Sequence, residues 1–402
     1  MCVNWRAVCT VWAEENVLRQ KFRLLFVSHC LPPTGRPNMN LGGMQRAAME
    51  LQASLEALED LQLQSCVLQS SRFWHYVRII PFYIRSLYRI WHLSRTGQID
   101  GVLFSAMPTA WMAIVLRKVL TKHSVVAATI CHGHDVTMTF PPYQWCVPRI
   151  FAALDAILPV SQATGQQCLR RGLPLDKLFV TPNGVDMDRF PRRVQGRHAD
   201  RSLLAGVGPA LPADALLLCS VGRQVPRKGF AWFVDQVMPA LPEHVHYWLA
   251  GTGPEHKNIA MAIARHGLEK RVTLLGRVSE EQLSSLYRGA DLFIMPNVPV
   301  PGDMEGFGLV LVEAGISGLP AVASAMEGIL DVVTDGVNGH LVPSENAPAF
   351  VAAIAPYVID TAQRIAASDR AVSYTLETFG WAAVAQSVLQ TLRTASLQCR
   401  HN

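Results

Sequence analysis

Residues Leu216–Gly229 read LLLCSVGRQVPRKG, and this stretch contains the pattern on which the fold assignment depends. A short apolar run ends at Val221 and is followed by Gly222, Arg223 and Lys228. Unbroken apolar runs are typical of parallel strands that helices cover on both faces, and ligands of such sheets bind beyond the carboxyl ends of the strands. An isolated Arg and Lys would more often belong to a solvated loop. Their position after a strand instead favours phosphate binding, in which Arg contacts two oxygens and Lys supplies a compact charge.

Similar apolar runs recur along the chain, separated by longer segments with helical periodicity such as residues 44–59. The expected strands are residues 24–29, 101–106, 125–131, 156–161, 178–181, 216–221, 246–250, 272–275, 292–295 and 321–323. Alternating strands and helices predict an α/β fold with doubly wound parallel sheets, and there are enough strands for two sheets.

The length of 402 residues is about twice that of a usual domain, so two domains are expected. A basic stretch that begins near Asp188 and ends in the Gly/Pro-rich segment Gly206–Pro212 indicates a linker. We therefore place one domain at residues 1–190 and the other at residues 191–380. A last helix, expected at Trp381–Leu397, has no strand after it.

Half of the residues are hydrophobic and 17% are charged, which argues against disorder. The nine cysteines form no C-x-x-C pair and indicate a reduced cytosolic protein, and we expect no secretory signal or membrane-spanning helix. Residues 1–185 carry 18 Lys and Arg against 10 Asp and Glu, whereas residues 186–402 carry 18 against 21. The basic first half suits a phosphorylated sugar, a polyprenyl phosphate or an acidic membrane surface. No nucleic-acid-binding motif is recognisable, so nucleic acid is not an expected partner.

The stretch Glu305–Glu313, EGFGLVLVE, places two carboxylates eight residues apart around a Gly-rich turn. If a helix begins near Gly308, Glu313 lies inside it and Glu305 lies in the preceding loop, beside free N–H groups. Each carboxylate can accept two hydrogen bonds from vicinal hydroxyls, and the amides of residues 306–308 can bind an anion or a sugar oxygen. An unpaired glutamate among the apolar neighbours of Glu313 would be costly, so a specific role is favoured.

Shorter motifs carry less information. Gly42-Gly43 precedes a predicted helix and fits either an anion-binding turn or an ordinary loop. His132 and His134 follow a predicted strand and could ligate a metal, but no third ligand is apparent nearby, so no metal site is expected. Gly251-Thr252-Gly253 lacks the last glycine of a dinucleotide loop and more closely matches a turn.

In order and spacing, these motifs resemble glycosyltransferase family 4, a family of retaining enzymes with the GT-B fold. The resemblance runs from about Leu24 to the C-terminus. It rests on the Gly-Gly loop, His132, Pro182–Asp186, Gly222-Arg223, Lys228-Gly229, Gly251-x-Gly253-Pro254, Glu305-x₇-Glu313, Gly315 and Gly318-Leu319-Pro320. It implies two facing Rossmann-like domains. The first is the acceptor side, joined by a crossover helix within residues 381–402, and the second binds the donor.

The resemblance also implies a role for each matching residue. Arg223 and Lys228 would bind the donor diphosphate, and Glu313 would bind the ribose hydroxyls. Glu305, with the amides of Gly306, Phe307 and Gly308, would bind the transferred sugar.

Further contacts are implied around the donor. Main-chain groups near Arg277 and Val278 would meet the base. Gly42 and Gly43 would approach the phosphates, and His132 would contact the sugar at the reaction centre. The catalytic set would then be His132, Arg223, Lys228 and Glu305. The family needs no metal, and the leaving phosphate itself is usually described as accepting the acceptor's proton. Glu305 is therefore not expected to act as a nucleophile.

The expected reaction is transfer of a hexose from a UDP- or GDP-linked sugar to a sugar or lipid-linked acceptor, in bacterial-type glycan or glycolipid assembly. No cofactor is expected. A nucleotide-sugar epimerase or a sugar phosphorylase could share the fold, and a sugar-binding protein without activity is a further alternative. A nicotinamide oxidoreductase would need a complete G-x-G-x-x-G after its first strand. Many family members have Pro-Ser where this chain has Pro296-Asn297, so the sugar is left open.

Arginines and aromatic residues alternate over Arg72–Arg95, a composition typical of a helix that lies in a membrane surface. Equally, many of the rings could pack in the core, and Pro81 would interrupt a single helix. We hypothesise that the first domain binds anionic lipid through Arg78, Arg85 and Arg89. We expect the protein to be cytoplasmic, and if it binds lipid it would be peripheral on the inner face of the membrane.

Overall fold

The computed structural model describes residues 21–31, 43–69, 72–185 and 190–401, which form two compact units. The first unit contains Met1–Val160, Thr164–Asn183 and Trp381–Asn402, and the second contains Ser161–Ala163 and Gly184–Gly380. The chain thus passes from the first unit to the second and returns to the first at its end.

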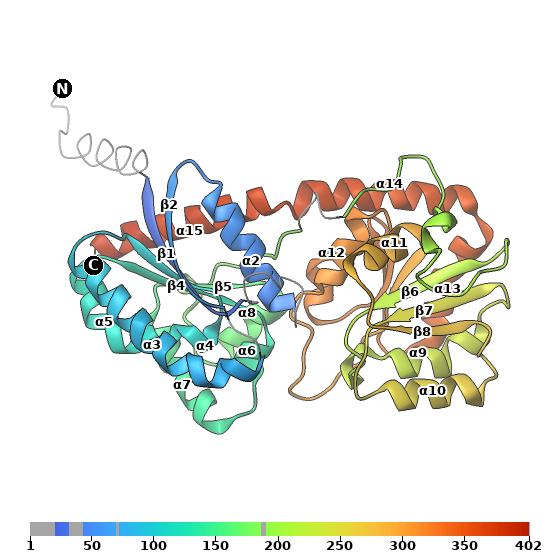
Figure 1. Ribbon diagram of the computed structural model, residues 1–402, viewed down its shortest axis with the longest axis horizontal. Helices are drawn as coiled ribbons and strands as arrows, with labels where there is room; N and C mark the ends of the chain where they lie inside the picture. Colours follow the sequence, from blue (N-terminus) through green and yellow to red (C-terminus); the bar gives the residue numbers. More distant parts are fainter. Residues whose placement is uncertain (1–20, 32–42, 70–71, 186–189, 402) are drawn as a thin grey trace. The chain divides into compact units, whose positions relative to one another are not determined.

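The first unit contains a wholly parallel sheet of five strands in the order β2-β1-β3-β4-β5. The strands are β1 (Phe22–Leu31), β2 (Leu61–Gln69), β3 (Gly101–Phe104), β4 (Val126–Cys131) and β5 (Ala156–Pro159). The helices are α2 (Gly43–Glu56), α3 (Arg72–Arg95), α4 (Met107–Ala110), α5 (Met112–Lys122), α6 (His134–Thr137), α7 (Pro141–Ala153), α8 (Gln162–Leu169) and α15 (Trp381–His401). Helices α2 and α15 cover one face of the sheet, and α3, α5 and α7 cover the other (Figure 1).

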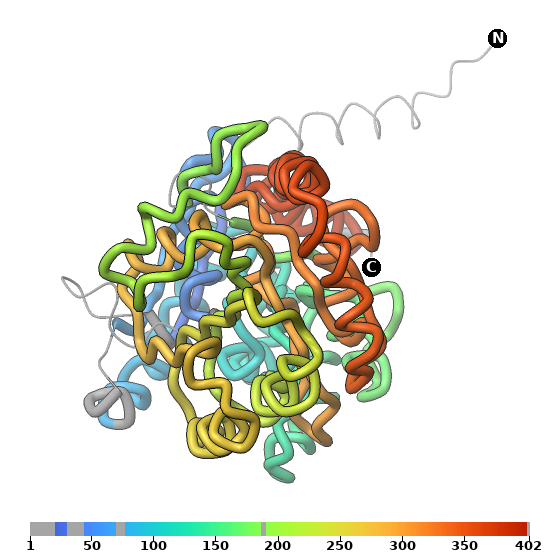
Figure 2. The backbone as a smooth tube through the Cα atoms, turned by 90° about the vertical axis from the view of Figure 1, so that its right-hand side faces the viewer, coloured from blue at the N-terminus to red at the C-terminus, as the bar shows by residue number. Residues whose placement is uncertain are grey.

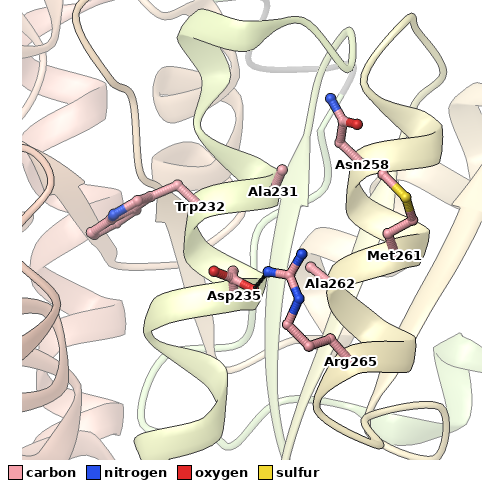
Figure 3. A pocket seen from close by; sticks show the side chains of 7 residues that line it. All are labelled: Ala231, Trp232, Asp235, Asn258, Met261, Ala262 and Arg265. Atoms are coloured by element: carbon pink, nitrogen blue, oxygen red, sulfur yellow. Dashed lines mark hydrogen bonds and ion pairs between the residues drawn. The ribbon is translucent and has the colours of Figure 1, made fainter.

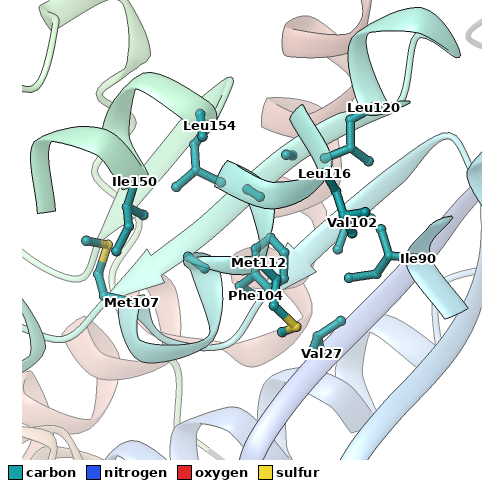
Figure 4. Close-up of a cluster of buried hydrophobic side chains, with 14 of the residues drawn as sticks. Val27, Ile90, Val102, Phe104, Met107, Met112, Leu116, Leu120, Ile150 and Leu154 are labelled. Carbon is teal, nitrogen blue, oxygen red and sulfur yellow. The ribbon is translucent and has the colours of Figure 1, made fainter. Parts of the chain in front are cut away.

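The core of the first unit lies between its sheet and α3, α5 and α7. Ile90 of α3 and Leu116 of α5 lie near Val102 and Phe104 of β3, and all four side chains are buried (Figure 4). Burying each such side chain contributes about 1.5–3 kcal/mol, so this layer is a main source of the unit's stability.

The second unit contains six parallel strands in the order β11-β10-β9-β6-β7-β8. The strands are β6 (Leu216–Val221), β7 (Val245–Ala250), β8 (Val272–Gly276), β9 (Leu292–Met295), β10 (Ala321–Ser324) and β11 (Gly339–Val342). The helices are α9 (Phe230–Gln236), α10 (His256–Arg265), α11 (Glu280–Gly289), α12 (Leu309–Ile316), α13 (Ala347–Ile359) and α14 (Thr361–Thr378). Helices α9 and α10 lie on one face and α11 and α12 on the other, and α14 (orange-red) packs beside α12 (orange) (Figures 1 and 2).

Nine of the ten predicted strands are present within one or two residues of their expected bounds, and the α/β prediction is confirmed. The exception is 178–181, where only an isolated bridge between Ile157 and Leu178 forms. Two strands were missed, β2 and β11, and both lie at an edge of their sheet. Residues 61–64 of β2 alternate Leu with Gln because an edge strand is less buried than a central one.

The expectation that Pro81 interrupts the helix over Arg72–Arg95 was wrong, because α3 continues through Pro81 as one helix. Phe82, Ile90 and Leu93 are buried against the sheet on both sides of the proline. This packing holds the helix together where proline removes one backbone hydrogen bond. Within the described residues, no helix combines the length and apolarity needed to cross a bilayer.

Candidate functional site

The loop after β6 carries two of the predicted site residues, Arg223 and Lys228. A short 3-10 turn, Pro226–Lys228, ends at Gly229, whose φ of 64° is left-handed. A Cβ atom at Gly229 would lie 1.9 Å from the carbonyl oxygen of Pro296, so glycine allows this loop to touch the loop after β9. The Lys228 side chain is buried at this contact, whereas the Arg223 side chain is exposed.

Glu305, in the loop after β9, receives hydrogen bonds from three side chains. The Nζ of Lys228 lies 2.5 Å from Oε2 of Glu305, and Arg227 donates to the same oxygen through Nη1. The Nδ2 of Asn297 donates to it as well, at 3.2 Å. Arg227 also donates through Nε to Asp303, at 2.9 Å. The two loops therefore form one charged cluster at the carboxyl ends of β6 and β9.

The charges of this cluster stabilise one another. Burial opposes the charged form of Glu305, but Lys228 and Arg227 outweigh it and lower the pKa of Glu305 to about 2. Burial lowers the pKa of Lys228, and the Glu305 carboxylate offsets part of that effect. For Arg227, the attraction of Glu305 and Asp303 exceeds the cost of burial, and its pKa is raised. Glu305 is therefore a carboxylate at neutral pH.

The two oxygens of the Glu305 carboxylate differ in their contacts. Among the described residues, its hydrogen bonds all go to Oε2, so Oε1 is left to accept a hydrogen bond from a ligand. The side chain keeps 10% of its surface exposed. The cluster therefore orients the carboxylate and presents one oxygen.

The loop after β10 fixes the backbone around Glu305. Oε2 of Glu327 accepts the Glu305 N–H at 2.5 Å, and Gly328 N–H donates to the Glu305 carbonyl at 3.1 Å. A Cβ at Gly328 would lie 2.2 Å from the carbonyl oxygen of Gly306, so the two segments pack backbone to backbone. Glu327 itself has a left-handed φ of 49°. Such a conformation persists where the surroundings enforce it.

The helix expected after the Gly-rich turn is present as α12. It begins at Leu309, and Gly308 precedes it with a left-handed φ of 86°. Phe307 is buried and makes an edge contact with Phe379. Glu313 is 4% exposed, and Tyr287 of α11 donates its hydroxyl to Oε2 of Glu313 at 3.0 Å. The Glu313 side chain is therefore held by a specific partner inside the unit, as expected for a buried carboxylate.

The loops after β7 and β8 lie beside the loop after β6. A Cβ at Gly251 would lie 1.9 Å from the carbonyl oxygen of Gly222, and the Gly251 N–H donates to Gly276, the last residue of β8, at 2.7 Å. Directly beyond Gly276, Arg277 is exposed and Val278 is half-buried. The predicted base-binding pair is thus at the same edge of the sheet as Lys228. Residues 251–253 lie in the loop before α10, and a turn follows at Pro254 and Glu255.

In the first unit, His132 directly follows β4. Its N–H donates to Oδ1 of Asp135 at 2.8 Å, and its Nε2 lies 2.9 Å from the Ser105 carbonyl. A carbonyl only accepts, so Nε2 carries a proton in this contact. Asp135 is buried, which raises its pKa, and it also accepts the Met107 N–H at 3.2 Å. Asp135 thus fixes the loop that orients His132.

The remaining predicted residues are placed as follows. Gly43 begins α2, and Gly42 lies outside the described residues. His134 is exposed, and in the described part of the chain no three His, Cys, Asp or Glu residues gather as metal ligands would. A depression of about 260 Å³ between α9 and α10 contains none of the predicted site residues (Figure 3). It is lined in part by the Asp235–Arg265 ion pair, at 2.5 Å.

Sequence reasoning did not include Arg227, Asn297, Glu327 or Tyr287 among the site residues. The first three follow the carboxyl ends of β6, β9 and β10, so the rule that placed Lys228 at a strand end could have found them. Tyr287 lies inside α11, and only the fold shows that it reaches Glu313.

Two family models of glycosyltransferases match consecutive parts of the chain. Residues 41–189 match the model of Glycosyltransferase Family 4, and residues 215–360 match that of Glycosyl transferases group 1. The D-inositol 3-phosphate glycosyltransferase of Xylanimonas cellulosilytica is 33% identical, over 62% of this chain and 59% of that protein. The GDP-mannose-dependent alpha-(1-6)-phosphatidylinositol monomannoside mannosyltransferase of Mycolicibacterium smegmatis is 28% identical, over 73% of this chain and 76% of that protein.

Among solved structures, Anabaena HepE in complex with UDP and glucose superposes with a TM-score of 0.66 at 19% identity, over 93% of this chain and all of that one. This likeness confirms the predicted GT-B fold. The chain spans about half the length of the first curated relatives it matches. The two family models cover consecutive parts of the chain, one mainly in each unit. By fold and by sequence, the chain belongs to the group 1 glycosyltransferases, the family that the order of its motifs predicted.

Proposed function

We propose that this protein moves a hexose, with retention of configuration, from a UDP- or GDP-linked sugar to a sugar or lipid-linked acceptor in bacterial-type glycan or glycolipid assembly. The observation that carries the proposal is the cluster of Lys228, Arg227 and Glu305 at the carboxyl ends of β6 and β9. It combines cations for a diphosphate with a carboxylate for sugar hydroxyls in one place. The relatives' names, with their GDP-mannose and inositol phosphate substrates, support the same chemistry.

Lys228 and Arg223 would bind the diphosphate. Arg223 is exposed and can turn to a ligand, and Lys228 is already fixed in position by Glu305. As the bond between the sugar and the diphosphate breaks, negative charge grows on the leaving phosphate. Cations that are already in place stabilise this charge without further reorganisation.

Glu305 would hold the transferred sugar. Its Oε1 can accept a hydroxyl, and the neighbouring Asn297 offers a second acceptor, since its buried Oδ1 has no hydrogen-bond partner among the described residues. Buried polar atoms are normally satisfied, so an unsatisfied one beside the site suits a ligand. The amides of Gly306, Phe307 and Gly308 would add donors, and Glu313, oriented by Tyr287, would bind the ribose hydroxyls.

In the proposed reaction, the acceptor oxygen forms a bond to the anomeric carbon while the bond from that carbon to the diphosphate oxygen breaks. The acceptor proton passes to the leaving phosphate on the same face, as the family resemblance implies, and no protein base is needed. His132, with its ring fixed by Ser105, would contact the sugar. We propose that the reaction uses neither a metal nor a cofactor.

The test is a thermal-shift screen of UDP, GDP and ADP and their sugars, followed by assay of the stabilising donor with acceptors. Ligands that bind the folded state raise its melting temperature. The expected product is a glycosylated acceptor with the anomeric configuration of the donor. An epimerised nucleotide sugar, or a sugar phosphate formed only with inorganic phosphate, would instead identify an epimerase or a phosphorylase.

A further inference from the structure

Helix α3 presents three different stripes along its length. Phe82, Ile90 and Leu93 point to the sheet and are buried. The opposite side exposes a row of apolar side chains, each more than 60% accessible to solvent: Val77, Ile80, Ile84 and Tyr88. Arg78 and Arg85 are exposed along one edge of this row. A surface helix normally has a polar outer face, so this apolar outer row requires an explanation.

On the same face of the sheet, α5 packs beside α3 and α7 packs beside α5 (Figure 1). Both helices resemble α3 in composition. In α5, Val115 is 61% exposed and lies among the exposed Lys118 and Lys122. In α7, Trp145 is 64% exposed, and the guanidinium of Arg149 lies 3.5 Å from the centre of its ring. Each helix thus presents a large apolar side chain together with a cation.

The sign of the charge is uniform over the three helices. Helices α3, α5 and α7 contain nine Lys and Arg residues and no Asp or Glu. Among the described side chains, Arg89 and Arg117 bind groups outside these helices: Arg89 donates to the Ser65 carbonyl at 2.9 Å, and Arg117 pairs with Asp155 at 2.6 Å. The sequence predicted lipid contact for Arg89, but its side chain is bound to the Ser65 carbonyl. The exposed cations of α5 and α7 are Lys118, Lys122 and Arg149.

We infer that the α3–α5–α7 face is a docking surface for an anionic lipid bilayer. This face is defined by the following exposed side chains: Val77, Arg78, Ile80, Ile84, Arg85, Tyr88, Val115, Lys118, Lys122, Trp145 and Arg149. The apolar side chains enter the boundary between headgroups and acyl chains, and the cations contact the lipid phosphates. The inference concerns this face alone and stands independently of the proposed reaction.

Charge decides between a bilayer and a second copy of this chain. Two copies meeting through this face would place like charges opposite one another, which is unfavourable. An anionic bilayer offers both a negative surface and an apolar interior, and so satisfies both kinds of side chain. The surface would bring the first unit close to any lipid-linked acceptor.

The experiment is flotation of the full chain with phosphatidylcholine vesicles, with and without phosphatidylglycerol. We compare Ile80→Asp/Ile84→Asp and Arg78→Ser/Arg85→Ser with matched changes at exposed positions of the second unit, Ile359→Asp and Arg192→Ser/Arg197→Ser. Each exposed cation strengthens binding to an anionic membrane by a similar amount. Removing two of them should weaken vesicle binding about thirtyfold. Circular dichroism and thermal unfolding confirm that each variant is folded.

The expected result is binding that requires phosphatidylglycerol, fades as salt shortens the Debye length from about 30 Å to about 3 Å, and is lost in the α3 variants only. Equal binding to neutral vesicles would overturn the inference, as would equal loss in the second-unit controls. Failure of the unaltered protein to float at low salt would also overturn it. So would sedimentation as a dimer that Ile80→Asp/Ile84→Asp converts to a monomer without any lipid binding.

Discussion

Lys228 and Glu305 form a buried ion pair, with 2.5 Å between Nζ and Oε2, that joins the loop after β6 to the loop after β9. Each residue is less than a tenth exposed, and each charge stabilises the other. A diphosphate can bind the remaining N–H groups of the Lys228 ammonium, and a sugar hydroxyl can bind Oε1 of Glu305. The pair provides separate positions for the two parts of a nucleotide sugar.

Replacing Lys228 by Ala should lower the turnover number at least about tenfold, because a charge-assisted hydrogen bond contributes about 1.5–3 kcal/mol. Arg223→Ala should behave similarly. Steady-state kinetics measure the effect, and Lys257→Ala, an exposed lysine of α10, is the matched control. Near-normal turnover in both variants would reject the diphosphate assignment.

The two glutamates should affect different steps. Glu313→Ala is expected to weaken binding of the free nucleoside diphosphate, since Glu313 is assigned to the ribose. Glu305→Gln should lower transfer but keep nucleotide binding, because it leaves Lys228 and Arg227 to the diphosphate. Calorimetric titration with UDP and GDP, together with transfer rates, separates the two. Equal loss of nucleotide affinity in both variants contradicts the division.

Stability at acid pH should depend on Glu305. Its pKa is lowered from the ordinary 4.5 to about 2, so its stabilising effect is complete above about pH 4.5 and is lost as pH falls towards 2. In urea unfolding between pH 5 and pH 2.5, the unaltered protein should therefore lose more free energy of unfolding than Glu305→Gln does. Glu377→Gln, at an exposed glutamate of α14, should follow the unaltered protein. Parallel profiles for all three would show that the ion pair does not lower the pKa.

His132→Ala should reduce transfer while leaving nucleotide affinity unchanged, because His132 belongs to the first unit and is assigned to the sugar. Asp135→Ala should reduce transfer and also destabilise the protein by about 1–3 kcal/mol, because the buried Met107 N–H and the part-buried His132 N–H lose their acceptor. His134→Ala, an exposed neighbour, should do neither. If His132→Ala transferred sugar at the normal rate, His132 would have no role at the reaction centre.

Transfer should persist in excess EDTA, since Lys228 and Arg223 are proposed to stabilise the leaving phosphate. Initial rates before and after dialysis against the chelator provide the measurement. Complete loss of transfer, reversed by adding a divalent ion, would require a metal in the reaction.

The sequence predicted the sheet interiors well because central parallel strands such as β6 and β9 are continuous apolar runs. It missed β2, where Leu and Gln alternate at a sheet edge, and the four-residue β11. Pro81 illustrates a different limit. Local propensity predicts a break, but the burial of Phe82 and Ile90 keeps α3 continuous, and this tertiary packing is not visible in local sequence.

For the site, strand ends were sufficient to place Lys228 and Glu305, whereas Arg277 was predicted from the family resemblance. The partners of these residues were harder to predict, because they come from loops far apart in sequence. Glu327, for example, reaches the Glu305 N–H across 22 residues. Whether Arg227 points to solvent or to Glu305 depends on the fold of both loops, so the sequence alone could not separate it from an ordinary basic loop residue.

Helix α15, the last in the chain, has a consequence for synthesis on the ribosome. Its Val388, Leu389 and Leu392 are buried in the first unit, where the helix packs on α2, β4 and β5, and Trp381 donates to Glu50 at 2.6 Å. These residues emerge only after the whole of residues 184–380 has been translated. The continuous second unit can therefore fold as it emerges, whereas the apolar surface of the first must wait, exposed to chaperones and to aggregation. The half of the chain that is made first is completed last.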